Sequence, residues 1–211
     1  MQKAVFWYAK AAELGFAKAQ SNLAYCYKCG EGVIKDISKA IEWWTKAAEQ
    51  GDAVAQYNLA LCYKKGEGVR KNYEIAVYWY IQAAEQGYSK AQNNLAVCYE
   101  NGCGVEKKTA KAVEWYTRAA EQGNAKAKYN LAWYYENGVV VDKDTEQAVR
   151  LYTQAAEQGS ALAQYHLTLY SGIDNGDEET IDLQAPSTEY KLAKKQFRMA
   201  VQHNGNTWNW N

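Results

Sequence analysis

The sequence is poor in the features on which membrane proteins and nucleic-acid-binding proteins depend. Its 211 residues contain one proline, and its 24 basic side chains are balanced by 24 acidic ones. A neutral chain has no electrostatic bias toward nucleic acid or an anionic membrane. No apolar run approaches the roughly 20 residues that span a bilayer. We therefore expect neither nucleic-acid binding nor membrane insertion, and the scarcity of proline suits a chain made almost entirely of helices.

Motifs that would indicate catalysis are missing as well. Catalysis needs a converging acid, base or nucleophile, and the only histidines are His166 and His203. The patterns G-x-S-x-G, H-E-x-x-H and G-x-x-x-x-G-K-S/T do not occur. The carboxylates between Asp174 and Asp182 lack the spacing of a calcium-binding loop. We therefore predict a protein that is not an enzyme and that holds neither a metal nor another cofactor.

The cysteines indicate neither disulfides nor a redox site. Cys26, Cys62 and Cys98 share one phase of a 36-residue spacing, and Tyr134 occupies that phase next, which indicates a packing position. Equivalent residues on stacked helices lie about 9–10 Å apart, whereas a disulfide needs Cα atoms within about 7 Å. The pair Cys26-x-x-Cys29 lacks the strand–helix context of a thioredoxin-like site. With no signal peptide in the N-terminal sequence, we predict free thiols and a cytoplasmic location.

The sequence does contain a repeat of 36 residues. The motif L-A-x-C/Y-Y returns at this spacing, and each unit closes with a glycine after a stretch such as A-A-E-Q-G. The repeat leucines are Leu23, Leu59, Leu95, Leu131 and Leu167, and the closing glycines are Gly15, Gly51, Gly87, Gly123 and Gly159. Such fixed periodicity is typical of stacked repeat proteins, in which neighbouring units bury each other's apolar faces.

Each unit predicts two helices. In the second unit, Ala55, Leu59 and Tyr63 share one stripe of a helix, and Gly66-Glu67-Gly68-Val69 then interrupts it. A second apolar stripe, with spacings of three and four, runs from Ile75 to Ala84. Neither helix buries enough surface alone, so the units must stack.

We therefore predict one all-α domain over residues 1–211, an α-solenoid of helix-turn-helix hairpins. It starts with the second helix of a unit at 1–15, continues with full units at 16–51, 52–87, 88–123 and 124–159, and ends with a C-terminal unit at 160–204, which contains an inserted loop at 171–186, and a tail at 205–211. One departure is Val140, which stands where the other units have the second glycine of Gly-x-Gly-Val. Valine does not readily adopt a positive φ, so this loop should differ in shape or be strained.

The pattern resembles the Sel-1-like repeat (SLR), a relative of the tetratricopeptide repeat. In the second unit the resemblance is carried by Leu59-Ala60, Tyr63, Gly66-Glu67-Gly68-Val69, Ala76, Trp79-Tyr80 and Ala83-Ala84-Glu85-Gln86-Gly87. It returns in every unit and covers nearly the whole chain except 171–186 and the tail. The resemblance implies a right-handed superhelix of helical hairpins that serves as an adaptor or scaffold for other proteins. One secreted branch of the family bridges a cysteine pair in each repeat, and this chain departs from that branch.

In related helical-hairpin repeats the first helices line the concave surface, which gives candidate partner-binding positions. The candidates two positions before a repeat leucine are Tyr57, Asn93, Tyr129 and Tyr165. The candidates two positions after it are Tyr25, Leu61, Val97 and Trp133. The candidates five positions after it are Lys28, Lys64, Glu100 and Glu136, with Lys65 beside Lys64. Tyrosine and tryptophan often anchor interfaces. The alternative is that Tyr57 and Tyr129 only pack against neighbouring first helices. The change from lysine to glutamate would place the acidic end of a peptide at the first units.

A second ladder precedes the repeat leucines. It consists of Asn22, Asn58, Asn94 and Asn130, with His166 in the fifth unit. A row of amides could clamp a ligand, but strict repetition favours a structural hydrogen bond, and for His166 it favours a scaffold role over catalysis.

The sequence thus predicts a non-enzymatic protein–protein interaction module that binds a peptide or protein in its concave groove. The alternative is a structural or assembly segment that stacks end to end with other repeats and has no groove ligand. Its motivation is the half unit at 1–15, whose inner face could dock on another copy and so permit end-to-end self-association.

Overall fold

The computed structural model describes residues 2–170, apart from the side chain of Leu169, and every regular element in that range is an α-helix. The helices are α1 (Gln2–Glu13), α2 (Ala17–Cys29), α3 (Ile37–Glu49), α4 (Ala53–Lys65), α5 (Tyr73–Glu85), α6 (Ser89–Asn101), α7 (Thr109–Glu121), α8 (Ala125–Asn137), α9 (Thr145–Glu157) and α10 (Ala161–Tyr170). The prediction of an all-α chain of helical hairpins is confirmed. The predicted loop 171–186, the closing helix of the last unit and the tail lie outside the described residues.

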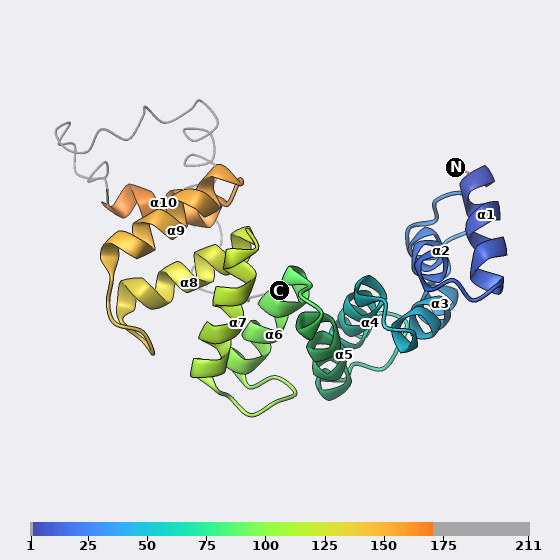
Figure 1. Ribbon diagram of the computed structural model, residues 1–211, viewed down its shortest axis with the longest axis horizontal. Coiled ribbons are helices and arrows are strands. Elements are labelled where there is room, and N and C mark those ends of the chain that lie inside the picture. The colour runs from blue at the N-terminus through green and yellow to red at the C-terminus, as the bar shows by residue number, and fades with distance from the viewer. Residues whose placement is uncertain (1, 171–211) are drawn as a thin grey trace, which may run out of the picture. The chain divides into compact units, whose positions relative to one another are not determined.

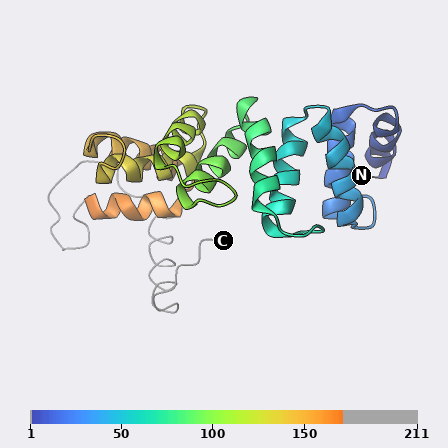
Figure 2. The same cartoon turned by 90° about the horizontal axis from the view of Figure 1, so that it is seen from below.

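The chain divides into two compact units, Met1–Ala127 and Lys128–Asn211. Within the first unit, each helix from α1 to α7 packs against the next one along the chain, as Figures 1 and 2 show. Within the second unit, α9 packs against α10. The boundary between the units falls in the first turn of α8.

The core of each hairpin contains one large aromatic side chain from the second helix. Trp44 on α3 is fully buried in a cluster with Ala24 of α2 and Leu59 of α4. Tyr80 on α5 is fully buried in the next cluster, together with Leu95 of α6. Small alanines around these rings let the helix backbones approach, and the ring fills the remaining space. Because each cluster includes the first helix of the following repeat, a hairpin completes its core only by stacking.

Polar side chains fix the ends of most helices. The residue before the helix accepts a hydrogen bond from the backbone amide three positions later at Asp36, Asp52, Asn72 and Asp144. The first helices α2, α4 and α6 end at a left-handed glycine, for example Gly66 with φ of 72°. Phe16 is the residue before α2 and makes no such side-chain bond. A missing cap costs a helix about 1 kcal/mol.

Buried glutamines tie each first helix of the first unit to the second helices around it. Gln20 Nε2 donates to the carbonyl oxygen of Ala12 at 3.1 Å, and Gln20 Oε1 accepts from Gln50 Nε2 at 2.7 Å. The same pair of bonds recurs for Gln56 with Ala48 and Gln86, and for Gln92 with Ala84 and Gln122. These bonds satisfy buried amides that would otherwise be costly, and they give the repeated A-E-Q-G motif a structural role that sequence reasoning missed.

The loop of the fourth repeat keeps the backbone of the glycine loops although it lacks the second glycine. Val140 has φ of 69°, close to the 71° of Gly104 at the equivalent position. Within residues 2–170, no other non-glycine residue has a positive φ. Of the two expected outcomes, altered shape or strain, the structure shows the strained backbone.

We expect Val140→Gly to raise the free energy of unfolding by about 1 kcal/mol, because glycine adopts a positive φ without the cost that a Cβ adds. Val140 is 54% exposed, so little packing is lost. Urea denaturation measures the change. Val139→Gly is the control, since its φ is not positive, and equal stabilisation by both variants would contradict the explanation.

Candidate protein-interaction face

The predicted partner-binding residues lie on the first helices of the repeats, and we call the side of these helices that carries them, taken in each unit by itself, the first-helix face. It is contributed by α2, α4 and α6 in the first unit and by α8 and α10 in the second. Tyr25, Trp133 and Tyr165 are 49%, 42% and 38% exposed, respectively. Leu61 and Val97 are half-buried. Every position two residues after the leucine from Tyr25 to Trp133 therefore presents an apolar side chain at least partly to solvent.

Two further candidates, Tyr57 and Tyr129, are half-buried and pack against other aromatic rings. The Tyr57 ring lies 6.1 Å from that of buried Tyr80 and 5.2 Å from that of Tyr88, measured between centroids. The Tyr129 ring lies 5.6 Å from that of buried Tyr152. Burial raises the pKa of both the Tyr57 and the Tyr129 hydroxyl. Tyr57 thus packs on the second helix α5 and on Tyr88, which precedes α6, whereas Tyr129 packs on the second helix α9 and on His166 of α10. Asn93 is also buried.

The two glutamates at the predicted rim bind tyrosine hydroxyls of their own unit. Glu100 Oε2 accepts the Tyr116 hydroxyl at 2.8 Å, and Glu136 Oε2 accepts the Tyr152 hydroxyl at 2.7 Å. In both pairs the tyrosine follows 16 residues after the glutamate. Glu136 Oε1 also accepts the Tyr170 hydroxyl at 2.7 Å. These carboxylates therefore satisfy buried phenols, a role that the recurring spacing could have indicated.

The ladder that precedes the repeat leucines makes a structural contact where its bonds are resolved. Asn94 Nδ2 donates to the Tyr80 hydroxyl at 3.2 Å. In the fifth repeat, the His166 ring stacks on Tyr152 with centroids 4.8 Å apart. His166 Nε2 lies 3.3 Å from the Tyr129 hydroxyl, and Nδ1 lies 3.6 Å from Glu136 Oε2. Burial lowers the pKa of His166, and Glu136 acts against this shift.

This environment predicts a pH dependence with a definite sign. Because the pKa of His166 is lower in the folded protein than in the unfolded chain, the unfolded chain binds more protons as the pH falls below neutrality. The stability that this histidine contributes above the pKa of the unfolded chain, 6.5, is therefore lost as the pH falls through the lower pKa of the folded protein. We expect His166→Asn to reduce this loss, since asparagine occupies the equivalent positions. Thermal unfolding between pH 7 and 5 measures it, and parallel curves for the two proteins would contradict the assignment.

The cysteines occupy the environments that the repeat phase predicts. All five are free; Cys26, Cys62 and Cys98 are buried, Cys103 is half-buried and Cys29 is exposed. Burial raises the pKa of Cys62 and of Cys98 to about 11.

Thiol labelling of the native protein should therefore be uneven. The thiolate is the reactive species, so a pKa raised by about two units slows Cys62 and Cys98 by roughly 100-fold even before burial is considered. We expect Cys29 to react first with a disulfide reagent at pH 8. Simultaneous fast reaction of all five thiols would show that the repeat core is open.

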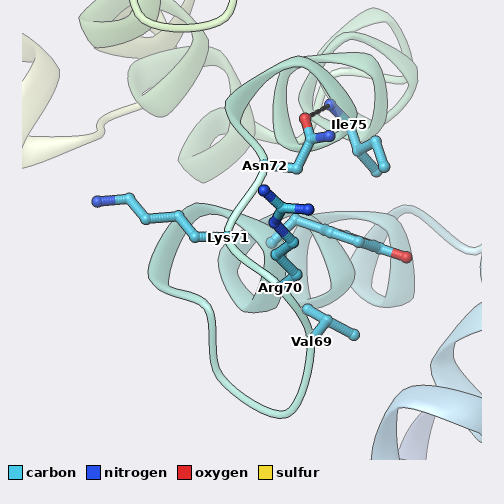
Figure 3. A pocket seen from close by; sticks show the side chains of 6 residues that line it. Val69, Arg70, Lys71, Asn72 and Ile75 are labelled. Atoms are coloured by element: carbon cyan, nitrogen blue, oxygen red, sulfur yellow. Dashed lines mark hydrogen bonds between the residues drawn. The ribbon is translucent and has the colours of Figure 1, made fainter.

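A shallow pocket of about 580 Å³ lies beside the glycine loop of the second repeat, away from the first-helix face positions. In Figure 3, Arg70 and Asn72 extend along its wall, whereas Lys71 points away from them. Asn72 Oδ1 is already engaged with the amide of Ile75, 3.0 Å away. Within residues 2–170, no cluster of three or more His, Cys, Asp or Glu side chains has the arrangement of a metal site. The pocket thus holds a helix cap and offers no converging catalytic groups.

The fold defines a repeat protein built of helical hairpins. Five Sel1 repeats are recognised in the chain, at residues 1–16, 17–52, 53–88, 89–124 and 125–160. The chain belongs to the Sel1 repeat family. Proteins of this family generally mediate protein–protein interactions, and their repeat is typically non-catalytic.

Several crystal structures are similar to the chain. A Sel1 repeat protein from Oxalobacter formigenes is 34% identical with a TM-score of 0.78, and the match covers 96% of this chain and 80% of that one. A protective antigen of uropathogenic Escherichia coli with an SLR fold is 33% identical with a TM-score of 0.76, over 96% of this chain and 41% of that one. The chain thus spans less than half the length of this antigen.

An immunity protein from Pseudomonas aeruginosa is 26% identical with a TM-score of 0.55, over 94% of this chain and 73% of that one. No protein of curated function matches the chain. Among residues 2–170, no helix is long and apolar enough to cross a membrane.

Proposed function

We propose that the chain is a protein-binding adaptor or scaffold that holds a peptide or protein segment on its first-helix face. The observation that carries the proposal is the apolar register two residues after the repeat leucine, at Tyr25, Leu61, Val97 and Trp133. Exposed tyrosine and tryptophan are the residue types most enriched in interface hot spots. Within the first unit, repetition of the position at Tyr25, Leu61 and Val97 offers an extended ligand a regular series of contacts.

Structural need does not account for the most exposed members of this register. Tyr25 is 49% and Trp133 is 42% exposed, and neither is a member of the core clusters described for residues 2–170. The buried rings Trp44 and Tyr80 already fill the hairpin cores. The exposed aromatic groups are therefore available to a partner without loss of the fold.

The test is affinity capture with a Tyr25→Ala, Trp133→Ala double variant beside the wild-type protein. Removing two aromatic anchors is expected to lower the affinity for a partner by at least about thirtyfold, which corresponds to about 2 kcal/mol. An Ile34→Ala, Tyr78→Ala variant is the control, because these side chains are 91% and 55% exposed on other surfaces. If every partner of the wild-type protein survives in the first variant, the proposal fails.

A second candidate function is assembly through α1. This helix and the residues after it expose Phe6, Trp7, Leu14 and Phe16, which are 55%, 66%, 78% and 63% accessible. One repeat later, the equivalents of Phe6, Leu14 and Phe16 are Glu42, Gln50 and Asp52. Phe16 also replaces a residue that caps the helix elsewhere. Exposed apolar patches of this kind mark contact sites, so this end of the first unit could associate with another chain.

Light scattering across a range of concentrations tests the second candidate. A Phe6→Glu, Leu14→Gln, Phe16→Asp variant restores the polar residues of the next repeat. If assembly is the function, the wild-type protein forms oligomers and this variant is a monomer. A wild-type protein that stays monomeric at high concentration excludes self-association and leaves the first-helix face proposal standing.

A further inference from the structure

The first-helix face of the first unit carries three lysines without acidic partners. Lys28 on α2 and Lys64 on α4 occupy equivalent positions, and Lys65 follows directly. Within residues 2–170, no carboxylate lies within 4.0 Å of any of these ammonium groups. Lys28 and Lys64 are half-buried, so they have given up part of their hydration without gaining an ion pair.

The surroundings of the lysines place them across successive first helices. Lys28 Nζ lies 5.5 Å from the centroid of the buried Trp44 ring. Burial raises the pKa of Cys62 on α4, and the charge of Lys28 acts against this shift. Lys64 acts in the same way on Cys98 of α6. The charge of each lysine thus acts on a buried cysteine of the next first helix. Positive charge therefore recurs at the same position of α2 and α4.

In the third repeat the position equivalent to Lys28 and Lys64 holds Glu100, which is hydrogen-bonded within the repeat. There, Glu100 accepts the Tyr116 hydroxyl. The lysines have no comparable anionic partner inside the described chain. The neutral total also hides an imbalance: residues 1–127 hold 17 basic and 13 acidic side chains, whereas residues 128–211 hold 7 and 11. The first unit therefore has a net charge of +4, which favours an acidic ligand.

We propose that the first-helix face of α2 and α4 binds an acidic peptide segment of a protein partner, an assignment that rests on the proposed function above. The carboxylates of the ligand pair with Lys28, Lys64 and Lys65. Its apolar side chains lie against Tyr25 and Leu61, each of which precedes a lysine by three residues and so shares its helix face.

The repeat also predicts the spacing of acidic residues in the ligand. The helices α2 and α4 contribute to one core cluster, and helices in such contact lie on the order of 10 Å apart. A polyproline II segment advances about 3.1 Å per residue with three residues per turn, so side chains three residues apart point to the same side. Carboxylates three residues apart in a polyproline II segment therefore match Lys28 and Lys64. The two residues between them present at least one side chain toward Tyr25 or Leu61.

The test is selection from a displayed library of random peptides against the whole wild-type chain. We expect enriched peptides to carry Asp or Glu at a spacing of three with apolar residues between. Their affinity should fall at least about tenfold for a Lys28→Gln, Lys64→Gln, Lys65→Gln variant. A Lys3→Gln, Lys10→Gln, Lys107→Gln variant is the matched control, because it removes the same charge from exposed positions elsewhere in the first unit. Its affinity should stay within about twofold of the wild-type value, and circular dichroism confirms that both variants fold.

The outcomes separate this inference from the proposed function. Enriched peptides without an acidic bias, or acidic peptides that bind the first variant as tightly as the wild-type protein, overturn the lysine assignment but leave the first-helix face as a binding surface. The same holds if the control variant loses affinity equally, because net charge rather than the face would then determine binding. If the wild-type chain enriches no peptide, both the inference and peptide binding by the face are overturned.

Discussion

Gly104→Ala should destabilise the protein by about 3 kcal/mol or more, one of the two largest effects that we expect. Gly104 has φ of 71°, and a Cβ there would lie 2.3 Å from the carbonyl oxygen of Tyr73 and 2.9 Å from the backbone nitrogen of Glu74. The obstacle is backbone at the start of α5, so no side-chain rotation relieves it. The strain of a positive φ adds about 1–2 kcal/mol to the cost of overpacking.

Gly87→Ala separates the two contributions. Gly87 has φ of 85°, but a Cβ there meets nothing within 4 Å. The variant Gly87→Ala should therefore lower the free energy of unfolding only by the strain of a positive φ, about 1 kcal/mol. Urea denaturation of both variants measures the difference. Equal losses would mean that the close approach of the glycine loop to α5 does not hold the hairpins together.

The second large effect is expected at Tyr80, whose replacement by alanine should cost about 3–5 kcal/mol. The side chain is fully buried between α5 and α6, and its hydroxyl accepts a bond from Asn94. The matched variant is Tyr25→Ala in the same unit. Tyr25 is 49% exposed, so its removal should cost less than about 1 kcal/mol.

This comparison divides the aromatic side chains between fold and function. If Tyr25→Ala leaves thermal unfolding unchanged and weakens partner binding, the binding defect cannot be attributed to misfolding. If it destabilises the protein as strongly as Tyr80→Ala, then Tyr25 is a core residue and its place on the first-helix face has been misjudged.

The fold could be predicted closely because its determinants recur at fixed spacing. The leucine at position 59 and an aromatic residue at position 80 return in the neighbouring repeats, so each position is observed several times within one sequence. The phase of Cys62 predicted a buried thiol for the same reason. Val140 could be recognised as unusual, although only the structure distinguishes a strained loop from a reshaped one.

The site could be predicted less completely. Periodicity places Tyr57 and Tyr25 on the same helical face. It does not show that the Tyr57 ring packs against the rings of Tyr80 and Tyr88, whereas Tyr25 is exposed to solvent. That difference depends on which ring the neighbouring repeat presents. Glu136 was predicted as a rim charge, yet its carboxylate binds two tyrosine hydroxyls from other helices. Such contacts are remote in sequence and are decided by side-chain reach.

Photocrosslinking shows whether partners bind the first-helix face. A photoreactive amino acid is placed at position 25 or 133 on that face, and in separate proteins at position 34 or 78, whose native side chains are also exposed. Each protein is mixed with a partner or peptide that the wild-type chain binds. We expect crosslinks from positions 25 and 133 and none from 34 and 78. Crosslinks confined to 34 and 78 would contradict binding to that face.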